Sequence, residues 1–179
     1  MTRLHVVTPQ QSDGRVKELF AGIQASVGMI PNIYQGVANS PAALEGLLHL
    51  GKVLGTGQLS GAEIEAVKLV VSQAYGCNYC LAAHTLLGKK HGLTEGETIA
   101  VRRGTIEQPK LGALVKFVNA VFRPEGRASD DDVRALRAAG YNDAQITEVV
   151  LVIAQTVFTN LFNRVHQTPV DFPPAPGIQ

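Results

Sequence analysis

Apolar side chains recur along most of this chain with the spacing of an amphipathic helix rather than the alternation of a strand. In the segment 41–55 the apolar stripe holds Leu44, Leu47, Leu48 and Leu54. Strand signals are almost lacking from the sequence. We therefore predict an all-α protein, with helices at 14–27, 32–38, 41–55, 60–74, 77–91, 94–103, 109–122, 130–139 and 143–165.

Helix-start signals support these positions. Ser40 can cap a helix whose first turn holds Pro41, where proline is favoured. Four other segments begin with the capping-box pattern, in which two residues three apart exchange hydrogen bonds: Ser60 with Glu63, Thr94 with Glu97, Ser129 with Asp132 and Asn142 with Gln145. The proline-rich segment 168–179 should be an extended tail.

Composition narrows the class of protein. With 179 residues, of which 45% are hydrophobic, we expect a single domain over 1–179 that buries its own core. The net charge is +1 and basic residues cluster only in pairs, which excludes a nucleic-acid-binding surface. The N-terminus lacks the apolar core of a signal peptide, and no apolar run reaches membrane-spanning length. We expect a soluble, cytoplasmic protein without a membrane partner.

An internal comparison indicates a repeat. At an offset of 82 residues, the segment 59–84 aligns with 141–166 without a gap, and 8 of 26 positions are identical, including His84 with His166. In the second copy Cys77 and Cys80 are replaced by threonine and phenylalanine. We predict an active half at about 41–104 and a degenerate second half at about 109–166.

The only two cysteines of the chain, Cys77 and Cys80, form a C-x-x-C pair, and His84 follows one turn later. Gly76 separates this segment from the preceding helix, which puts Cys77 in the first turn of a new helix, where free amides stabilise a thiolate. At these spacings all three side chains share one helical face, so the imidazole can exchange a proton with a thiol. In a reducing cytosol such a pair indicates a catalytic or metal-binding site rather than a structural disulfide.

Glu65 is a further candidate. It lies twelve residues before Cys77, on a helix whose inward face is expected to hold Ile64, Val67, Val71 and Ala74. Burial there would raise the pKa of Glu65 and make it a proton carrier. The alternative is a solvated helix residue.

Two other interpretations of the cysteines stay open. They can be ordinary buried thiols beside a surface histidine, or they can bind a metal ion. A site that includes His91 is excluded, because eleven helical residues separate it from Cys80 by about 16 Å. A site made of Cys77, Cys80, His84 and Glu65 remains conceivable.

The combined spacing of Glu65, Cys77, Cys80 and His84 resembles the carboxymuconolactone decarboxylase superfamily, in particular its alkylhydroperoxidase AhpD-like, peroxidase-related branch. The resemblance extends from IPNIYQGVANSPAAL at 30–44 through LRAAGYND at 136–143 to TPVDFP at 168–173. It implies an AhpD-like helical bundle of repeated hairpins that assembles as a dimer, trimer or hexamer.

The resemblance also implies roles for the site residues. Cys80 would be oxidised by peroxide to a sulfenic acid, Cys77 would donate a proton and then close the disulfide, and Glu65 with His84 would relay protons. Family members with a histidine between the cysteines differ from this chain, which has Tyr79 and hence a differently shaped site.

The leading hypothesis is an oxidoreductase, a thiol peroxidase that reduces hydrogen peroxide or organic hydroperoxides and is reset by an external dithiol or reductase, without a cofactor. The alternatives are a lyase of the carboxymuconolactone decarboxylase type and a non-enzymatic redox sensor. Apolar helices such as 111–122 favour a homo-oligomer, because they offer more apolar surface than one small bundle buries.

Overall fold

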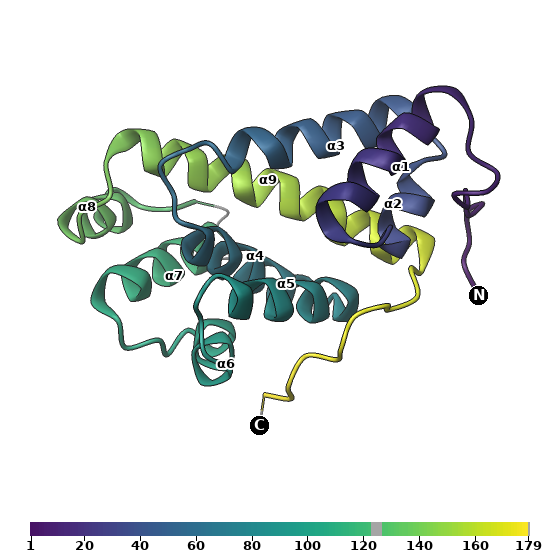
Figure 1. Cartoon of the computed structure of the whole chain (residues 1–179). Helices are drawn as coiled ribbons and strands as arrows, with labels where there is room; N and C mark the ends of the chain where they lie inside the picture. Colours follow the sequence, from purple (N-terminus) through teal and green to yellow (C-terminus); the bar gives the residue numbers. More distant parts are fainter. Residues whose placement is uncertain (123–126, 179) are drawn as a thin grey trace.

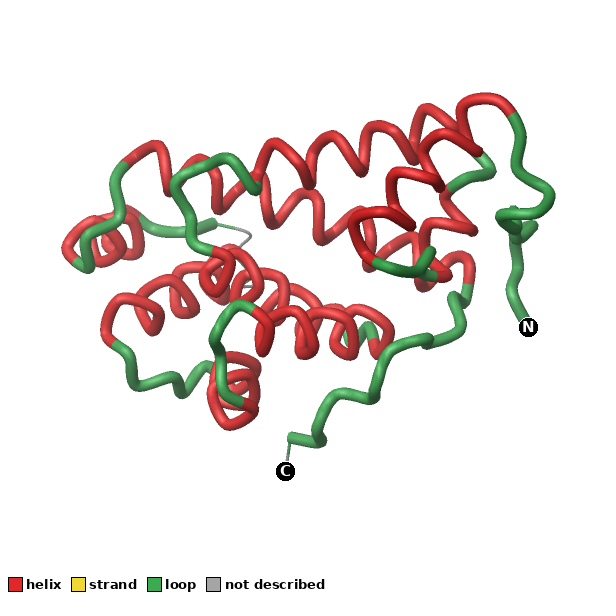
Figure 2. Tube along the Cα trace, viewed as in Figure 1, coloured by secondary structure: helices red, strands yellow, loops and turns green. Residues whose placement is uncertain are grey.

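The computed structural model describes residues 1–122 and 127–178, and within these ranges the chain forms helices and loops without a strand (Figures 1 and 2). Every predicted helix is present, and each bound agrees to within one residue. The helices are α1 (Gly14–Val27), α2 (Asn32–Val37), α3 (Pro41–Leu54), α4 (Gly61–Tyr75), α5 (Asn78–Lys90), α6 (Glu95–Arg103), α7 (Pro109–Val121), α8 (Asp130–Ala138) and α9 (Asp143–His166).

Local capping explains why the helix starts were predictable. The Ser40 hydroxyl accepts a hydrogen bond from the Ala43 amide, and Pro41 occupies the first turn of α3. All four predicted capping boxes are formed, at the starts of α4, α6, α8 and α9. These bonds satisfy amides that the helix itself leaves free.

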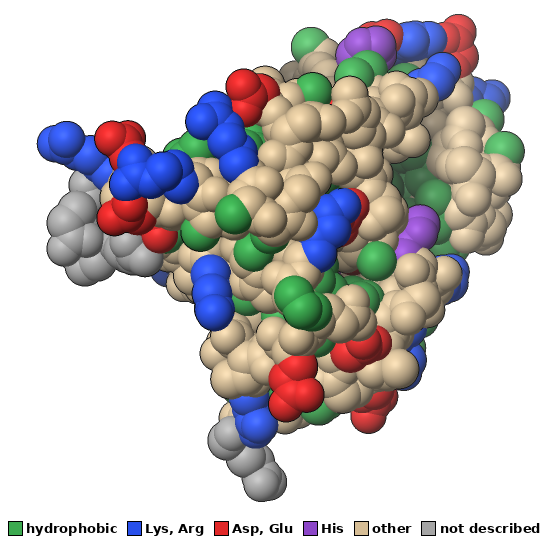
Figure 3. All heavy atoms as spheres, turned by 90° about the vertical axis from the view of Figure 1, so that its left-hand side faces the viewer, with side chains coloured by type: hydrophobic (Ala, Val, Ile, Leu, Met, Phe, Trp, Pro, Cys, Tyr) green, Lys and Arg blue, Asp and Glu red, His purple; other side chains and the backbone are tan. Residues whose placement is uncertain are grey.

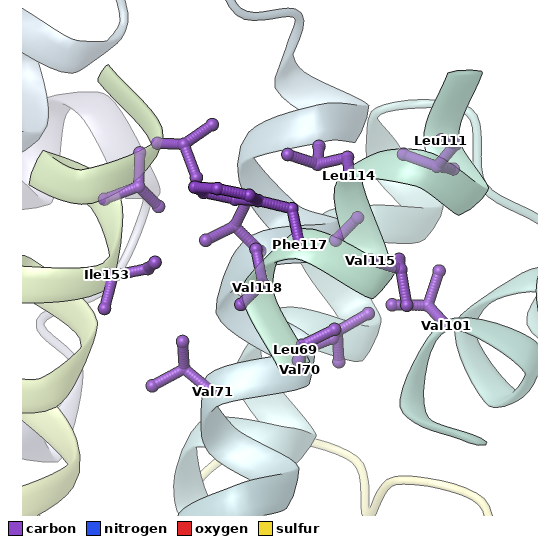
Figure 4. Packing of buried hydrophobic residues seen from close by; sticks show 14 of the residues in the cluster. Leu69, Val70, Val71, Val101, Leu111, Leu114, Val115, Phe117, Val118 and Ile153 are labelled. Carbon is purple, nitrogen blue, oxygen red and sulfur yellow. The ribbon is translucent and has the colours of Figure 1, made fainter. Parts of the chain in front are cut away.

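Helix α4 is the centre of the fold. It packs against α5, α6, α7 and α9, and Val67 and Val71 are fully buried as predicted, whereas Ala74 is exposed, contrary to the prediction. Figure 4 shows valines and leucines of α4, α6 and α7 meeting Ile153 of α9 in the main core. Because α4 has neighbours on most sides, it buries polar residues as well, including Glu65.

The apolar face of α7 belongs to this same core. Leu114, Val115 and Val118 are almost completely buried within the chain. The segment 111–122 therefore does not supply the exposed apolar surface on which the oligomer prediction was based.

A second, smaller core joins the N-terminal helices to the cysteines. It holds apolar residues of α1, α2 and α3 together with Cys77, Tyr79 and Cys80. Helix α3 lies alongside α9, α2 packs against both α3 and α9, and α1 packs against α3 (Figure 1). The cysteines therefore lie at the seam between the two cores.

The C-terminal tail is extended, as predicted, and runs back from the end of α9 towards α6 (Figure 1). Asp171 accepts a hydrogen bond from the Asn32 amide at 2.7 Å, and Arg102 of α6 donates one to the Pro176 carbonyl at 2.6 Å. The tail is thus attached at two points, on either side of the cysteine region.

The two segments aligned by the internal comparison differ in structure. The first is divided at Gly76 into α4 and α5, whereas the second is the single helix α9. The predicted division into an active and a degenerate half stays a prediction.

Helix α9 is the one helix in the described part of the chain that is long and apolar enough to cross a membrane. One face of α9 packs on α3 and α4. Core helices of globular proteins can have the same length and hydropathy as a membrane-spanning helix. Acidic and basic side chains are interspersed on the molecular face in Figure 3. The cytoplasmic location stays a prediction.

Candidate active site

The turn between α4 and α5 places the two cysteines. Gly76 ends α4 in the left-handed conformation, with φ of 61°, which glycine adopts without the strain of a side chain. Cys77 is then the N-cap of α5, and its Sγ accepts a hydrogen bond from the Cys80 amide at 3.3 Å. The cysteine begins the helix, as the sequence predicted.

The sulfurs of Cys77 and Cys80 are 2.6 Å apart, and both cysteines are free thiols. The hydrogen bond with Cys80 lowers the pKa of Cys77 to about 7, and this effect, together with the α5 amides and Asn163, outweighs burial. The hydrogen bond with Cys77, burial and the negative charge on Cys77 raise the pKa of Cys80. The first negative charge of the pair therefore rests on Cys77, at the helix N-terminus.

Cys80, in contrast to Cys77, lines a cavity of about 190 Å³. The cavity wall is mainly apolar and aromatic, with polar groups from Lys68 and His84. The structure thus separates two properties of the pair, because Cys77 carries the charge more readily and Cys80 faces the space that a small ligand can enter.

Glu65 is 4% exposed and contacts two residues that line this cavity. Its carboxylate is 2.8 Å from Nδ1 of His84 and accepts a hydrogen bond from Nζ of Lys68 at 2.9 Å. Burial alone would raise the pKa of Glu65, but the charges and hydrogen bonds of His84 and Lys68 lower it to about 2. The expectation of a raised pKa is therefore wrong, because the sequence did not indicate that His84 and Lys68 both meet this carboxylate.

His84 connects Glu65 to the cavity. Its Nδ1 is bonded to the ionised carboxylate and so carries the proton, which leaves Nε2 available for proton exchange. No hydrogen bond joins His84 to either sulfur in residues 1–122 and 127–178, although His84 and Cys80 line the same cavity. A substrate or water in the cavity can bridge them.

Tyr79, between the cysteines, is a buried wall residue. Its hydroxyl accepts a hydrogen bond from the Ile33 amide at 3.2 Å, and its ring meets that of Phe172 edge to face at 5.5 Å between centroids. Burial raises the pKa of Tyr79, so the phenol stays protonated. Tyr79 shapes the site, while Phe172 brings the C-terminal tail to the cavity.

A metal centre finds no support in the geometry. Among the residues that the structure describes, no group of three or more histidine, cysteine, aspartate or glutamate side chains is arranged to hold an ion. His91 lies at the far end of α5 and packs on Gly61.

Sequence analysis missed three residues of the site. Lys68 pairs with Glu65, Phe172 closes one side of the cavity, and Asn163 of α9 approaches both sulfurs. The signal for Asn163 was its position three residues after Asn160, on the same side of the helix, because a buried amide requires a polar partner.

Comparisons with known proteins agree with this architecture. Residues 41–121 match the model of the carboxymuconolactone decarboxylase family. The sequence has no significant match among curated proteins.

Several solved structures share the fold. The AhpD core of an uncharacterized peroxidase-related protein from Ralstonia eutropha JMP134 has a TM-score of 0.85 at 19% identity, covering 95% of this chain and 92% of its own. An uncharacterized peroxidase-related protein from Silicibacter sp. TM1040 has a TM-score of 0.75 at 24% identity, covering 97% and 95%. The debrominase Bmp8, as a variant bound to 2,3,4-tribromopyrrole, has a TM-score of 0.81 at 15% identity, covering 96% and 92%. At these identities the likeness establishes the AhpD-like helical fold.

Proposed function

We propose that this protein is a thiol-dependent peroxidase, because residues 41–121 match the carboxymuconolactone decarboxylase family model and the chain has an AhpD-like fold. Its substrate is hydrogen peroxide or an organic hydroperoxide. The observation that carries the proposal is the contact between the sulfurs of Cys77 and Cys80, 2.6 Å apart, beside a cavity that Cys80 shares with His84.

In the first step the Cys80 thiolate attacks the peroxide in the cavity. The thiol proton leaves Cys80 through a cavity water to Nε2 of His84. As the S–O bond forms the O–O bond breaks, and the leaving alkoxide or hydroxide takes that proton from His84. The products are the Cys80 sulfenic acid and an alcohol or water.

In the second step the Cys77 thiolate attacks the Cys80 sulfur. The S–S bond forms, the S–O bond breaks, and hydroxide leaves as water with a proton supplied through His84. An external dithiol then donates two electrons and two protons, which restores both thiols. Cys77 suits both roles, as attacking thiolate and as leaving group, because its pKa is lowered to about 7.

Glu65 and Lys68 support the proton transfers. The ionised carboxylate of Glu65 accepts the Nδ1 proton of His84 and so holds the ring in one tautomer. Lys68, at 2.9 Å, keeps Glu65 ionised inside the protein. His84 thereby keeps Nε2 for the reacting groups.

The test is peroxide consumption by the purified protein in excess dithiol. We expect many turnovers per chain in the wild type and a loss of turnover in Cys80→Ser. In Cys77→Ser the second thiol is missing, so turnover should slow, and the sulfenic acid of Cys80 should accumulate when peroxide is added without dithiol. Thr85→Val is the matched control, because Thr85 is buried in α5 but does not line the cavity.

The alternatives give different results in the same assay. A redox sensor would oxidise once per chain even with excess dithiol. A lyase of the carboxymuconolactone decarboxylase type would retain activity on a carboxylated lactone after both cysteines are alkylated. Unchanged peroxide consumption by Cys80→Ser would contradict the proposed mechanism.

A further inference from the structure

The buried face of α9 carries polar side chains where the helix meets the cysteines. Thr156, Asn160, Asn163 and His166 are each at most 5% exposed. A buried amide destabilises the fold unless it has hydrogen-bond partners. The two asparagines of this face differ in the groups that they contact.

Asn160 has ordinary structural partners. Its Nδ2 donates to the Thr156 carbonyl at 2.7 Å, within the helix, and lies 3.5 Å from Oγ of Ser72. Asn160 makes no hydrogen bond to either sulfur in the described part of the chain.

Asn163 has different partners. Its Nδ2 is 3.2 Å from Sγ of Cys80 and 3.9 Å from Sγ of Cys77, and within the described ranges its Oδ1 has no hydrogen-bond partner. Within the described residues, the side-chain hydrogen bonds of Asn163 therefore go to the two sulfurs. A thiolate is a stronger hydrogen-bond acceptor than a neutral thiol, so this N–H stabilises Cys80 most when its sulfur carries negative charge.

The two sulfurs receive hydrogen bonds from different helices. The N-terminal amides of α5 stabilise charge on Cys77, as at the hydrogen bond from the Cys80 amide. Asn163 reaches the pair from α9 and lies nearer to Cys80, the sulfur that lines the cavity. Asn163, together with the Ser72 hydroxyl, therefore favours charge on Cys80, whereas the helix end favours charge on Cys77.

We propose that Asn163 is a catalytic residue, which donates its side-chain N–H to the Cys80 thiolate and thereby makes Cys80, rather than Cys77, the sulfur that attacks a substrate in the cavity. The turnover part of this inference rests on the proposed peroxidase function, whereas the effect on the thiol does not. The same contact lowers the pKa of Cys80 against the opposing effects of Cys77 and burial.

The test measures the rate of alkylation of Cys80 against pH in a Cys77→Ser background, where one thiol remains. Asn163→Leu keeps the approximate volume but removes the donor. Because a hydrogen bond to a charged group is among the stronger ones, we expect the midpoint pH to rise by about one unit and the rate at pH 7 to fall about 10-fold. In a Cys80→Ser background the midpoint of Cys77 should move less, since Asn163 is farther from that sulfur.

Asn160→Leu is the matched control, a buried asparagine three residues away on the same helix. It should leave the Cys80 midpoint unchanged. If Asn163→Leu does not fold, Asn163→Ala serves in its place, with the helical content measured by circular dichroism.

Two outcomes would overturn the proposal: a folded Asn163 variant with an unchanged Cys80 midpoint, or an equal shift in Asn160→Leu. The wild type can also consume no peroxide while its Cys80 midpoint still depends on Asn163. That result would contradict the peroxidase function but support the role of Asn163 in activating the thiol. In a working peroxidase, Asn163→Leu should also reduce the rate of the peroxide step about 10-fold, by the same loss of thiolate stabilisation.

Discussion

Nδ1 of His84 lies 2.8 Å from Oε2 of Glu65, a contact that joins α5 to α4 beneath the cysteines. Lys68 binds the other carboxylate oxygen, so the buried carboxylate lies between the ammonium of Lys68 and the imidazole of His84. This arrangement explains why Glu65 keeps its charge in the interior and why His84 has a defined tautomer.

The first prediction concerns stability against pH. The pKa of Glu65 is lowered from 4.5 to about 2 in the folded protein, so the carboxylate stabilises the fold above pH 4.5. This contribution, on the order of 3 kcal/mol, should be lost as the pH falls from 4.5 towards 2. Chemical denaturation of the wild type and Glu65→Gln across this range measures it, and Glu65→Gln should show the weaker pH dependence.

Glu63→Gln is the control for chemistry at Glu65. Glu63 is also a buried carboxylate on α4, but it binds Ser60 and Tyr141 rather than His84. We expect Glu65→Gln to slow peroxide turnover by about 100-fold, the usual scale of acid–base catalysis, and Glu63→Gln to leave turnover unchanged. Equal turnover in Glu65→Gln and the wild type would remove Glu65 from the mechanism.

A second prediction concerns the ionisation of Cys77. Because its pKa is lowered to about 7, mainly through the hydrogen bond with Cys80, its alkylation rate in the folded protein should have a midpoint near pH 7. Cys80→Ala removes that hydrogen bond and should move the midpoint upward. Mass spectrometry of peptides alkylated with iodoacetamide gives the rates, and the urea-unfolded protein provides the reference value. A midpoint that Cys80→Ala leaves unmoved would contradict the coupling.

The tail should control access to the thiols. Phe172 packs edge to face against Tyr79 and lines the cavity. Phe172→Ala removes an aromatic pair of about 1 kcal/mol, so a bulky thiol reagent should react up to about 10-fold faster, with little change for a small one. Val170→Ala, in the same tail but exposed and outside the cavity wall, is the control. Equal acceleration of both reagents would indicate general unfolding instead of local access.

A fourth prediction tests the packing of α2 on α9. A Cβ atom at Gly36 would lie 2.7 Å from Cδ2 of His166 and 3.0 Å from Cε1 of Phe162. Gly36→Ala should therefore destabilise the protein by about 2 kcal/mol, as overpacking of a core does. Gly22→Ala in α1, where a Cβ atom meets nothing within 4 Å, should instead stabilise by about 0.5 kcal/mol. Thermal unfolding of both variants measures the difference, and equal melting temperatures would reject this packing.

Oligomerisation remains a prediction. The exposed apolar surface that supports it lies on α9 and not on the segment 111–122. Val150, Phe158, Leu161 and Val165 form an exposed apolar face on α9. A second copy of the chain could cover this face, and we expect light scattering at micromolar concentration to give a dimer or larger assembly. Leu161→Glu should dissociate it, whereas Lys116→Glu, on exposed α7 surface, should not. A monomeric wild type would contradict the prediction.

The positions of the helices followed from the sequence because the forces that decide them are local. Capping boxes and the apolar spacing involve residues within one or two turns, and the observed bounds agree to one residue. The same local geometry predicted that Cys77 would begin α5 and that Cys80 and His84 would share a face. These three residues were identified before any tertiary contact was known.

The protonation states and the remaining site residues depended on contacts that span the chain. The charge of Glu65 required His84 from the next helix, 19 residues away, and the environment of Cys80 required Asn163, 83 residues away. Apolar periodicity indicates that α9 buries a face, but it does not say which helix that face will meet or where an asparagine on it will point. Helix boundaries and the cysteine pair were therefore determined by sequence alone, whereas the packing of α9 and the tail on the α4–α5 turn decided which sulfur faces the cavity and which groups surround it.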